Sequence, residues 1–143
     1  MVRIIRHTGI VVRNLDQSLQ FYKKLGFQLW SREIEFGDFI DQVVGISKVS
    51  IEVAKLKLPD SSMIELLQYL SHPQNDEIAK APSNRLGCSH VAFTVENIET
   101  SCDEIKDMGG SIVNPPALSP NGLVKVAYAH DIEGNLLELV EEL

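Results

Sequence analysis

HTGIVVRNLD at residues 7–16 and HVAFTVENIE at residues 90–99 are two versions of one pattern, and they decide the fold. Each begins with histidine, continues through apolar and β-branched residues, and ends with asparagine, an aliphatic residue and an acid. The same offset separates Gly26 from Gly109. A self-match at one fixed offset indicates a duplicated structural unit. We therefore expect two halves with the same order of elements.

The composition limits the classes of function. The chain has 143 residues, of which 44% are hydrophobic, and a net charge of −7 at pH 7. This length supports a core without covalent staples, and the acidic balance argues against a nucleic-acid surface. Cys88 and Cys102 lack a CxxC spacing, so we expect neither a disulfide framework nor a thiolate zinc site, and a reducing, cytoplasmic setting. No signal-peptide segment and no apolar run near the roughly 18 residues of a membrane span is present, so no membrane partner is expected.

In the first half, the hydrophobic pattern predicts one helix and four strands. Asn14 is a suitable N-cap for a helix over residues 15–25, and Gly26, which can adopt positive φ, ends it. Residues 37–45 fit either a loop or a short helix. A turn at residues 59–62 makes a hairpin of the last two strands. The predicted strands are residues 3–13, 27–36, 48–58 and 63–70.

The second half repeats this order. A helix over residues 98–108 follows Asn97, and residues 115–122 are expected to form a loop and a turn. The predicted strands are residues 89–95, 111–114, 123–130 and 135–141. We therefore predict an α+β fold in which each half is β-α-β-β-β. The first module spans residues 1–72, the linker residues 73–86 and the second module residues 87–143.

Each half offers one histidine and one strand-interior carboxylate. Glu65 and Glu138 each interrupt a run of aliphatic residues, and alternation along a strand places them on the face opposite their neighbours. A buried carboxylate is costly without a partner. We therefore predict one four-ligand site, shared by the two halves and made of His7, Glu65, His90 and Glu138. Imidazole and carboxylate suit Zn²⁺, Ni²⁺, Co²⁺, Mn²⁺ or Fe²⁺, and open coordination positions would admit a substrate.

Plainer interpretations exist for each of these residues. Glu65 can face solvent on an open sheet, and His7 can be an ordinary surface residue. The repeat favours the metal site because both halves place histidine and glutamate on equivalent elements. His72 and His130 fall at loops or strand ends, and we interpret them as bystanders.

Several phrases of the sequence resemble one known superfamily over nearly the whole chain. They are residues 7–12, 16–22, 63–67, 87–95 and 131–138. The resemblance is to the vicinal oxygen chelate superfamily, which includes glyoxalases, bleomycin resistance proteins and extradiol dioxygenases. It implies two βαβββ modules that form a curved eight-stranded mixed sheet around a metal-binding cleft. It does not fix the reaction, because the superfamily contains isomerases, lyases, dioxygenases and thiol transferases.

The ligand order His, Glu, His, Glu resembles that of bacterial glyoxalase I, a lactoylglutathione lyase. This resemblance implies a metal-dependent lyase or isomerase that acts on an α-carbonyl or thioester substrate through an enediolate or enolate. The metal would act as a Lewis acid, with Glu138 as the first candidate for the catalytic base and Glu65 as the second. Exposed sheet edges favour a homodimer, and the linker permits a cleft within one chain or across the dimer.

Three alternatives stay open. Methylmalonyl-CoA epimerases are similar in length, but they typically carry glutamine in place of Glu65 and an acid before the third strand, where residues 47–48 here are Ser and Lys. Extradiol dioxygenases use a three-ligand set; the spacing of Tyr128 and Asp131 resembles their signature, although Ile132 replaces the usual proline. Tyr128 is also interpretable as an ordinary strand aromatic. A non-catalytic drug- or metabolite-binding protein is the third alternative.

Overall fold

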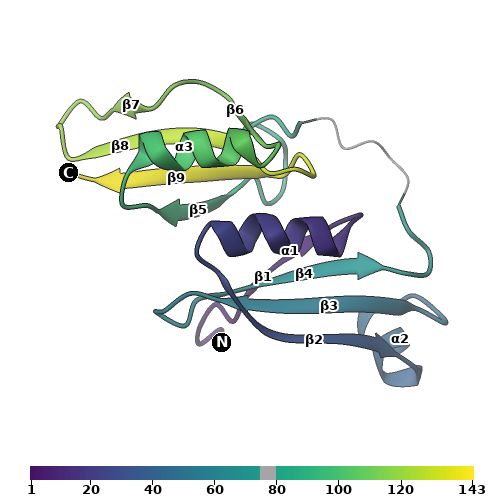
Figure 1. The fold of residues 1–143 in the computed structure, drawn as a ribbon. Coiled ribbons are helices and arrows are strands. Elements are labelled where there is room, and N and C mark those ends of the chain that lie inside the picture. Colours follow the sequence, from purple (N-terminus) through teal and green to yellow (C-terminus); the bar gives the residue numbers. More distant parts are fainter. Residues whose placement is uncertain (75–79) are drawn as a thin grey trace. The chain divides into compact units, whose positions relative to one another are not determined.

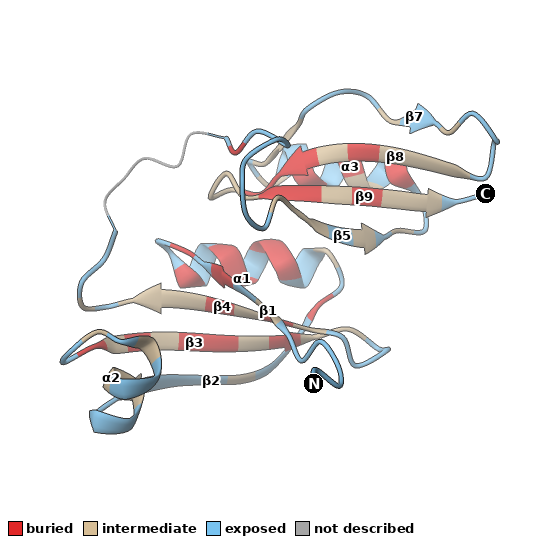
Figure 2. Ribbon diagram, turned by 180° about the vertical axis from the view of Figure 1, so that it is seen from behind, coloured by how far each residue is buried: buried red, intermediate tan, exposed pale blue. Residues whose placement is uncertain are grey.

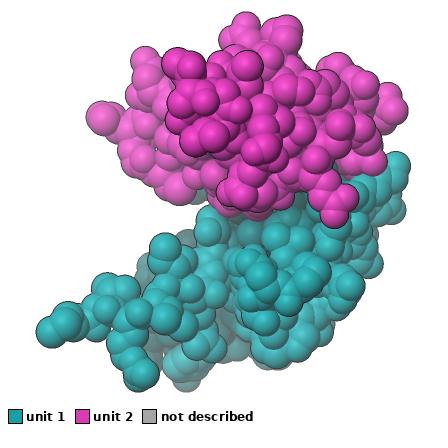
Figure 3. Space-filling view, turned by 90° about the vertical axis from the view of Figure 1, so that its left-hand side faces the viewer, with its two compact units in different colours: residues 1–76 teal, residues 77–143 magenta. Residues whose placement is uncertain are grey.

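The computed structural model describes residues 1–74 and 80–143, which belong to two compact units. The N-terminal unit comprises residues 1–76 and the C-terminal unit residues 77–143 (Figure 3). Each unit contains a mixed β-sheet with a helix packed on it (Figure 1). The α+β class is therefore confirmed, and the described strands pair as two sheets, one in each unit.

The N-terminal unit is built on a four-stranded sheet of order β1-β4-β3-β2. Strands β1 and β4 are parallel, whereas β3 is antiparallel to both of its neighbours. Strand β2 lies at a sheet edge, and its pairing with β3 has a register shift between Leu29 and Ser31. The elements are β1 (Thr8–Val11), α1 (Leu15–Lys24), β2 (Gln28–Phe36), α2 (Asp38–Val44), β3 (Ser50–Lys57) and β4 (Met63–Tyr69).

Helix α1 forms where the sequence predicts it. The Asn14 side chain accepts a hydrogen bond from the Gln17 amide at 3.0 Å, and Asp16 lies in the positively polarised first turn. Leu19 and Tyr22 are buried on the face that packs on the sheet, and Figure 2 shows that α1 alternates between buried and exposed positions. The helix therefore covers one face of the sheet. The opposite face is not covered by α1.

Helix α2 resolves the segment that the sequence left open. Residues 38–44 are helical, and Gly45 ends the helix with a left-handed φ of 73°. Ile40 and Val44 pack against a buried cluster of the sheet, made of Val49, Ile51 and Val53. Alternation places Ile51 and Val53 on the face opposite α1, so α2 covers one end of that second face.

The C-terminal unit repeats this plan with the order β5-β9-β8-β6, and β7 also pairs with β8. Strands β5 and β9 are parallel, as β1 and β4 are. Asn97 caps α3 by accepting a hydrogen bond from the Thr100 amide at 2.8 Å. The elements are β5 (Val91–Thr94), α3 (Ile98–Asp107), β6 (Ser111–Ile112), β7 (Ala117–Leu118), β8 (Val124–His130) and β9 (Leu136–Glu142).

Two sequence predictions about elements were wrong. The predicted strand over residues 3–13 is confined to Thr8–Val11: β4 begins at Met63, so residues before His7 have no neighbour in it, and at the other end the chain leaves the sheet for the helix cap at Asn14. Residues 115–122, predicted as a loop and a turn, contain the two-residue strand β7. Its pairing of Ala117 with Val126 is too short to leave an alternating pattern in the sequence.

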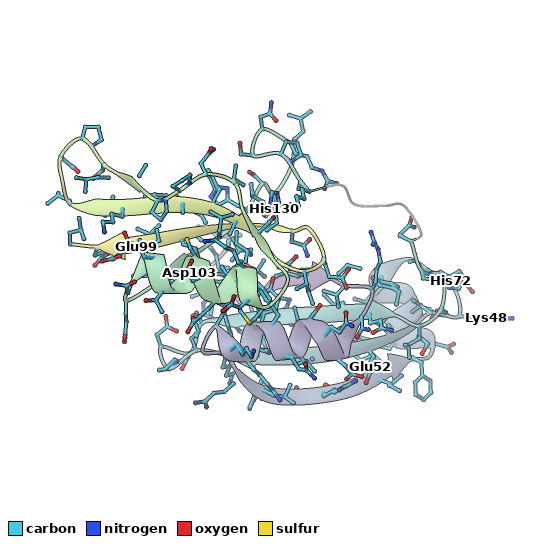
Figure 4. The ribbon with its side chains drawn as sticks, turned by 45° about the horizontal axis from the view of Figure 1, so that its top comes forward. Lys48, Glu52, His72, Glu99, Asp103 and His130 are labelled. Atoms are coloured by element: carbon cyan, nitrogen blue, oxygen red, sulfur yellow. The ribbon has the colours of Figure 1, made fainter. Side chains whose placement is uncertain are left out.

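His130, which the sequence sets apart from the metal site, has a structural role. It is buried at the end of β8, and its Nε2 lies 2.9 Å from the carbonyl oxygen of Ala81 (Figure 4). The Ala81 amide in turn donates to the Gly134 carbonyl at 3.2 Å. These contacts fasten the segment that begins at Ala81 to the β8–β9 hairpin. Within the predicted linker, residues 79–81 could form at most a helical turn judged by their sequence, and they lie partly outside the described residues.

Candidate metal centre

The parallel pairing of β1 with β4 brings His7 to Glu65. In this register Gly9 lies opposite Glu65, and His7 is two positions earlier, on the same face. His7 Nε2 is 3.2 Å from Glu65 Oε2, and the Glu65 side chain is 13% exposed. Gly9 places no side chain on this face, and a Cβ there would stand 3.3 Å from Leu67 Cδ1.

The parallel pairing of β5 with β9 repeats the arrangement in the other unit. Ala92 lies opposite Glu138, and His90 precedes it by two positions. His90 Nε2 is 2.8 Å from Glu138 Oε2, and the Glu138 side chain is 22% exposed. Each unit therefore places its histidine beside its strand-interior glutamate.

The residues behind the two glutamates differ. Lys55 on β3 stands opposite Glu65, and Tyr128 on β8 stands opposite Glu138 in the equivalent register. Lys55 Nζ is 3.9 Å from Glu65 Oε1. The Tyr128 ring packs edge-on against the His90 ring, with centroids 5.2 Å apart and planes at 66°. The cross-strand neighbour of Glu65 is thus a cation, whereas the cross-strand neighbour of Glu138 is a tyrosine whose ring packs on His90.

The geometry of each pair fits two ligands of one divalent ion. Nitrogen and oxygen ligands that lie about 2.0–2.1 Å from a metal stand about 2.9 Å apart at a right angle and about 3.3 Å apart at the tetrahedral angle. The two His–Glu separations, 3.2 and 2.8 Å, are close to this range without rearrangement. Within residues 1–74 and 80–143, no group of three or more His, Cys, Asp or Glu side chains suited to a metal is found. Each unit thus offers two side chains that could bind an ion, and both the ligand role and the sharing of one ion by all four stay predictions.

The remaining residues that the sequence singled out have structural roles. The Asp131 carboxylate accepts hydrogen bonds from the amides of Glu133 and Asn135, both at 2.9 Å, and so shapes the turn between β8 and β9. His72 is exposed beyond the end of β4 (Figure 4) and contacts the Ser71 hydroxyl at 3.1 Å.

The sequence does not mark Lys55 as a neighbour of the site, and it singles out Tyr128 without its contact to the His90 ring. The pattern of residues 48–58 places Lys55 inside a strand, but it does not show which residue of β4 is opposite. Cross-strand register alone makes Lys55 a neighbour of Glu65.

No helix among the described residues is long and apolar enough to cross a membrane.

Comparisons with known proteins extend over nearly the whole chain. Residues 4–139 match the family described as Glyoxalase/Bleomycin resistance protein/Dioxygenase superfamily. A probable lactoylglutathione lyase of Synechocystis is 33% identical over 137 residues, which are 94% of this chain and 92% of that protein. The lactoylglutathione lyase of Escherichia coli O157:H7 is 30% identical over 95% of this chain and 90% of that protein.

A solved structure shows the same fold. The crystal structure of a glyoxalase family protein from Bacillus cereus superposes with a TM-score of 0.92 and 30% identity, covering 100% of this chain and 96% of that one. Glyoxalase I from Zea mays, at 20% identity and a TM-score of 0.65, shares the fold over 96% of this chain and 46% of that one.

Proposed function

We propose that this chain, which belongs to the glyoxalase/bleomycin resistance protein/dioxygenase superfamily, is a metal-dependent lyase or isomerase of the glyoxalase I type. One observation carries the proposal. Each unit has a histidine in contact with a glutamate, and the two contacts occupy equivalent positions of equivalent parallel strand pairs, β1–β4 and β5–β9. A drug-binding protein of this fold has no need of two such pairs. The relatives named lactoylglutathione lyase support the choice of reaction.

The proposed substrate is the hemithioacetal that methylglyoxal forms with a thiol such as glutathione. The reaction moves the C1 hydrogen to C2 as a proton, and the C1 hydroxyl proton passes to the former ketone oxygen. The hemithioacetal carbon becomes a thioester and the ketone becomes an alcohol, so no oxidant or reductant is needed. The chemistry requires one carboxylate that removes the C1 proton and delivers it to C2.

The ligand set proposed for the metal is His7, Glu65, His90 and Glu138. A bound divalent ion supplies Lewis-acid polarisation of the substrate oxygens, which lowers the cost of removing a proton next to a carbonyl. The imidazoles of His7 and His90 and the carboxylate of Glu65 would hold the ion. Glu138 is the proposed base, because the described contacts of its carboxylate are with one histidine, whereas Glu65 also has a lysine at its second oxygen.

The backing of Glu138 suits this role. The His90 ring also packs edge-on against the Tyr128 ring, a contact that would help the imidazole keep its orientation if Glu138 rotates. The His90–Glu138 contact is short at 2.8 Å, and the glutamate is partly exposed. A partly exposed carboxylate of this kind can rotate toward a substrate while its backbone stays in the strand.

The test begins with metal identification in the purified protein. The metal-free protein is reloaded separately with Zn²⁺, Ni²⁺, Co²⁺, Mn²⁺ and Fe²⁺, and thioester formation from methylglyoxal adducts of glutathione is followed by ultraviolet absorbance. We expect turnover that EDTA abolishes and at least one of these ions restores. Parallel assays with acyl-CoA epimers and with catechols in an oxygen electrode cover the epimerase and dioxygenase alternatives. Metal binding without turnover of any of these substrates would contradict the proposal and favour a binding protein.

We also propose that the protein is a homodimer in a reducing, cytoplasmic setting. Both cysteines, Cys88 and Cys102, are free thiols, which is usual in such a compartment. Light scattering of the purified protein tests the oligomeric state. A single species at the mass of one chain, across the micromolar range, would contradict the dimer.

A further inference from the structure

A row of alternating polar groups crosses the sheet of the N-terminal unit, one from each strand or its end. It runs from His7, just before β1, through Glu65 on β4 and Lys55 on β3 to Glu33 on β2. Lys55 Nζ lies 3.6 Å from Glu33 Oε1 and 3.9 Å from Glu65 Oε1. His7 approaches the other oxygen of Glu65, at 3.2 Å.

The corresponding row of the C-terminal unit ends differently. It contains His90, Glu138 and Tyr128. His90 contacts the Glu138 carboxylate, and the Tyr128 ring packs against the His90 ring. Among the described residues, the ion pairs of the Glu138 carboxylate are with His90 alone. The two halves therefore present the same pair of ligands with different support, and the difference lies at one position of the row.

We propose that Lys55 is a positioning residue, which holds Glu65 in one orientation and so leaves proton transfer to Glu138. This inference rests on the proposed glyoxalase-type function. A carboxylate with a partner on each oxygen has one preferred orientation, because rotation about its last bond breaks both contacts. A carboxylate with one partner can rotate at the cost of a single contact.

Burial supports the assignment. Lys55 is 26% exposed and Glu33 is 54% exposed, so the outer pair is solvated and weak by itself. Glu65, at 13%, is the most enclosed member of the row. Glu33 is therefore only a weak second partner of Lys55, and the inference rests on the contact of Lys55 with Glu65. Groups that orient a ligand from behind commonly change metal affinity or activity by about 10- to 100-fold when they are removed.

The decisive experiment places Lys55→Met in a Glu138→Gln background. The Glu138→Gln variant is expected to lose most of its kcat. If Lys55 restrains Glu65, its removal frees a second carboxylate for proton transfer, and kcat of the double variant should rise at least about tenfold above that of Glu138→Gln. An ordinary structural contribution of Lys55 would instead lower kcat further. A double variant at or below the kcat of Glu138→Gln overturns the proposal.

Lys57 provides the matched control. It lies on the same strand and face as Lys55, but its Nζ stands 3.4 Å from the centre of the Trp30 ring. Lys57→Met in the Glu138→Gln background should leave kcat unchanged. Lys55→Arg, which keeps the charge, should give no recovery. Recovery in either of these two variants would contradict a specific role of Lys55.

A second readout is independent of turnover. Crystal structures of the metal-free protein should show the Glu65 carboxylate in one orientation in the wild type and displaced or split in Lys55→Met. An unchanged carboxylate in Lys55→Met overturns the inference even when the wild type is an active enzyme. An inactive wild-type protein would instead remove the proposed function, and the crystallographic result would still decide whether Lys55 orients Glu65.

Discussion

Gln68 and Glu141 make the same contact in the two units, each three positions after the glutamate proposed as a metal ligand. Gln68 Oε1 accepts a hydrogen bond from the Leu15 amide at 2.7 Å, and Glu141 Oε2 accepts one from the Ile98 amide at 2.8 Å. Leu15 and Ile98 are the first residues of α1 and α3. The strand that carries the ligand is thereby fixed to the start of the helix behind it, because a helix start has amides with no partner inside the helix.

Removal of these acceptors should destabilise the protein. We expect Gln68→Ala and Glu141→Ala each to lower the free energy of unfolding by about 1 kcal/mol, because a partly buried amide loses its acceptor. Urea unfolding followed by circular dichroism measures the change. Gln20→Ala, on the exposed side of α1, is the control and should stay within about 0.5 kcal/mol of the wild type.

Glu138→Gln tests the proposed base. The amide keeps the size of the side chain but cannot accept the proton, so kcat should fall by about 10²- to 10⁴-fold. Glu142→Gln, on the same strand and exposed, should leave kcat close to that of the wild type. Full turnover by metal-loaded Glu138→Gln would remove this residue from the mechanism.

Both histidines should matter equally for metal binding if the four ligands share one ion. An ion that binds only the folded protein, at about 1,000 times its Kd, stabilises it by about 4 kcal/mol and raises Tm accordingly. In His7→Ala and His90→Ala the metal-dependent rise in Tm should shrink by similar amounts, whereas exposed His72→Ala should retain it. A rise that depends on one histidine alone would show that the two pairs do not share an ion.

Gly110 should tolerate no side chain. A Cβ at this position would stand 2.6 Å from the His130 carbonyl oxygen and 2.7 Å from Ile105 Cγ2. We expect Gly110→Ala to cost about 1–3 kcal/mol of stability through this overlap. Gly122→Ala is the comparison: its φ is 71° with nothing within 4 Å of the new Cβ, so it bears only the backbone strain of about 1 kcal/mol. Equal losses in chemical denaturation would contradict this account of Gly110.

The two thiols should differ in reactivity. Cys102 is buried in α3, and burial raises the pKa of its thiol, whereas Cys88 is exposed. A raised pKa means a smaller fraction of the reactive thiolate at any pH below it. At pH 8, iodoacetamide should therefore modify Cys88 well before Cys102 in the folded protein, as mass spectrometry of peptides can show. Urea should bring the two rates together.

Much of this architecture was predictable from the repeat. Two copies of one pattern placed His7 and His90 at equivalent strands, and the glutamates inside apolar runs marked the faces opposite the core. Helices α1 and α3 carried their own signals in Asn14 and Asn97, which the structure confirms as caps. These features depend on residues near one another in the sequence.

What the sequence could not show depends on distant partners. Lys55 becomes a neighbour of Glu65 through the β3–β4 register, and a register cannot be deduced from the alternation of one strand. His130 is buried because Ala81, far away in the chain, folds onto it. The N-terminal residues alternate like a strand, yet β1 begins only at Thr8, because β4 begins at Met63 and offers the preceding residues no partner.

The edge strand β2 has a consequence for handling the protein. An open, flat strand invites another molecule to add to the sheet, which is how aggregates begin. Here the shift at Leu29 and Ser31 breaks the regular ladder, and the charged side chains of Arg32, Glu33 and Glu35 follow it. These charges stand among exposed apolar residues of the same strand, Trp30, Ile34 and Phe36, and oppose the addition of a further strand, so neutralising them should make concentrated stocks turn cloudy sooner on storage.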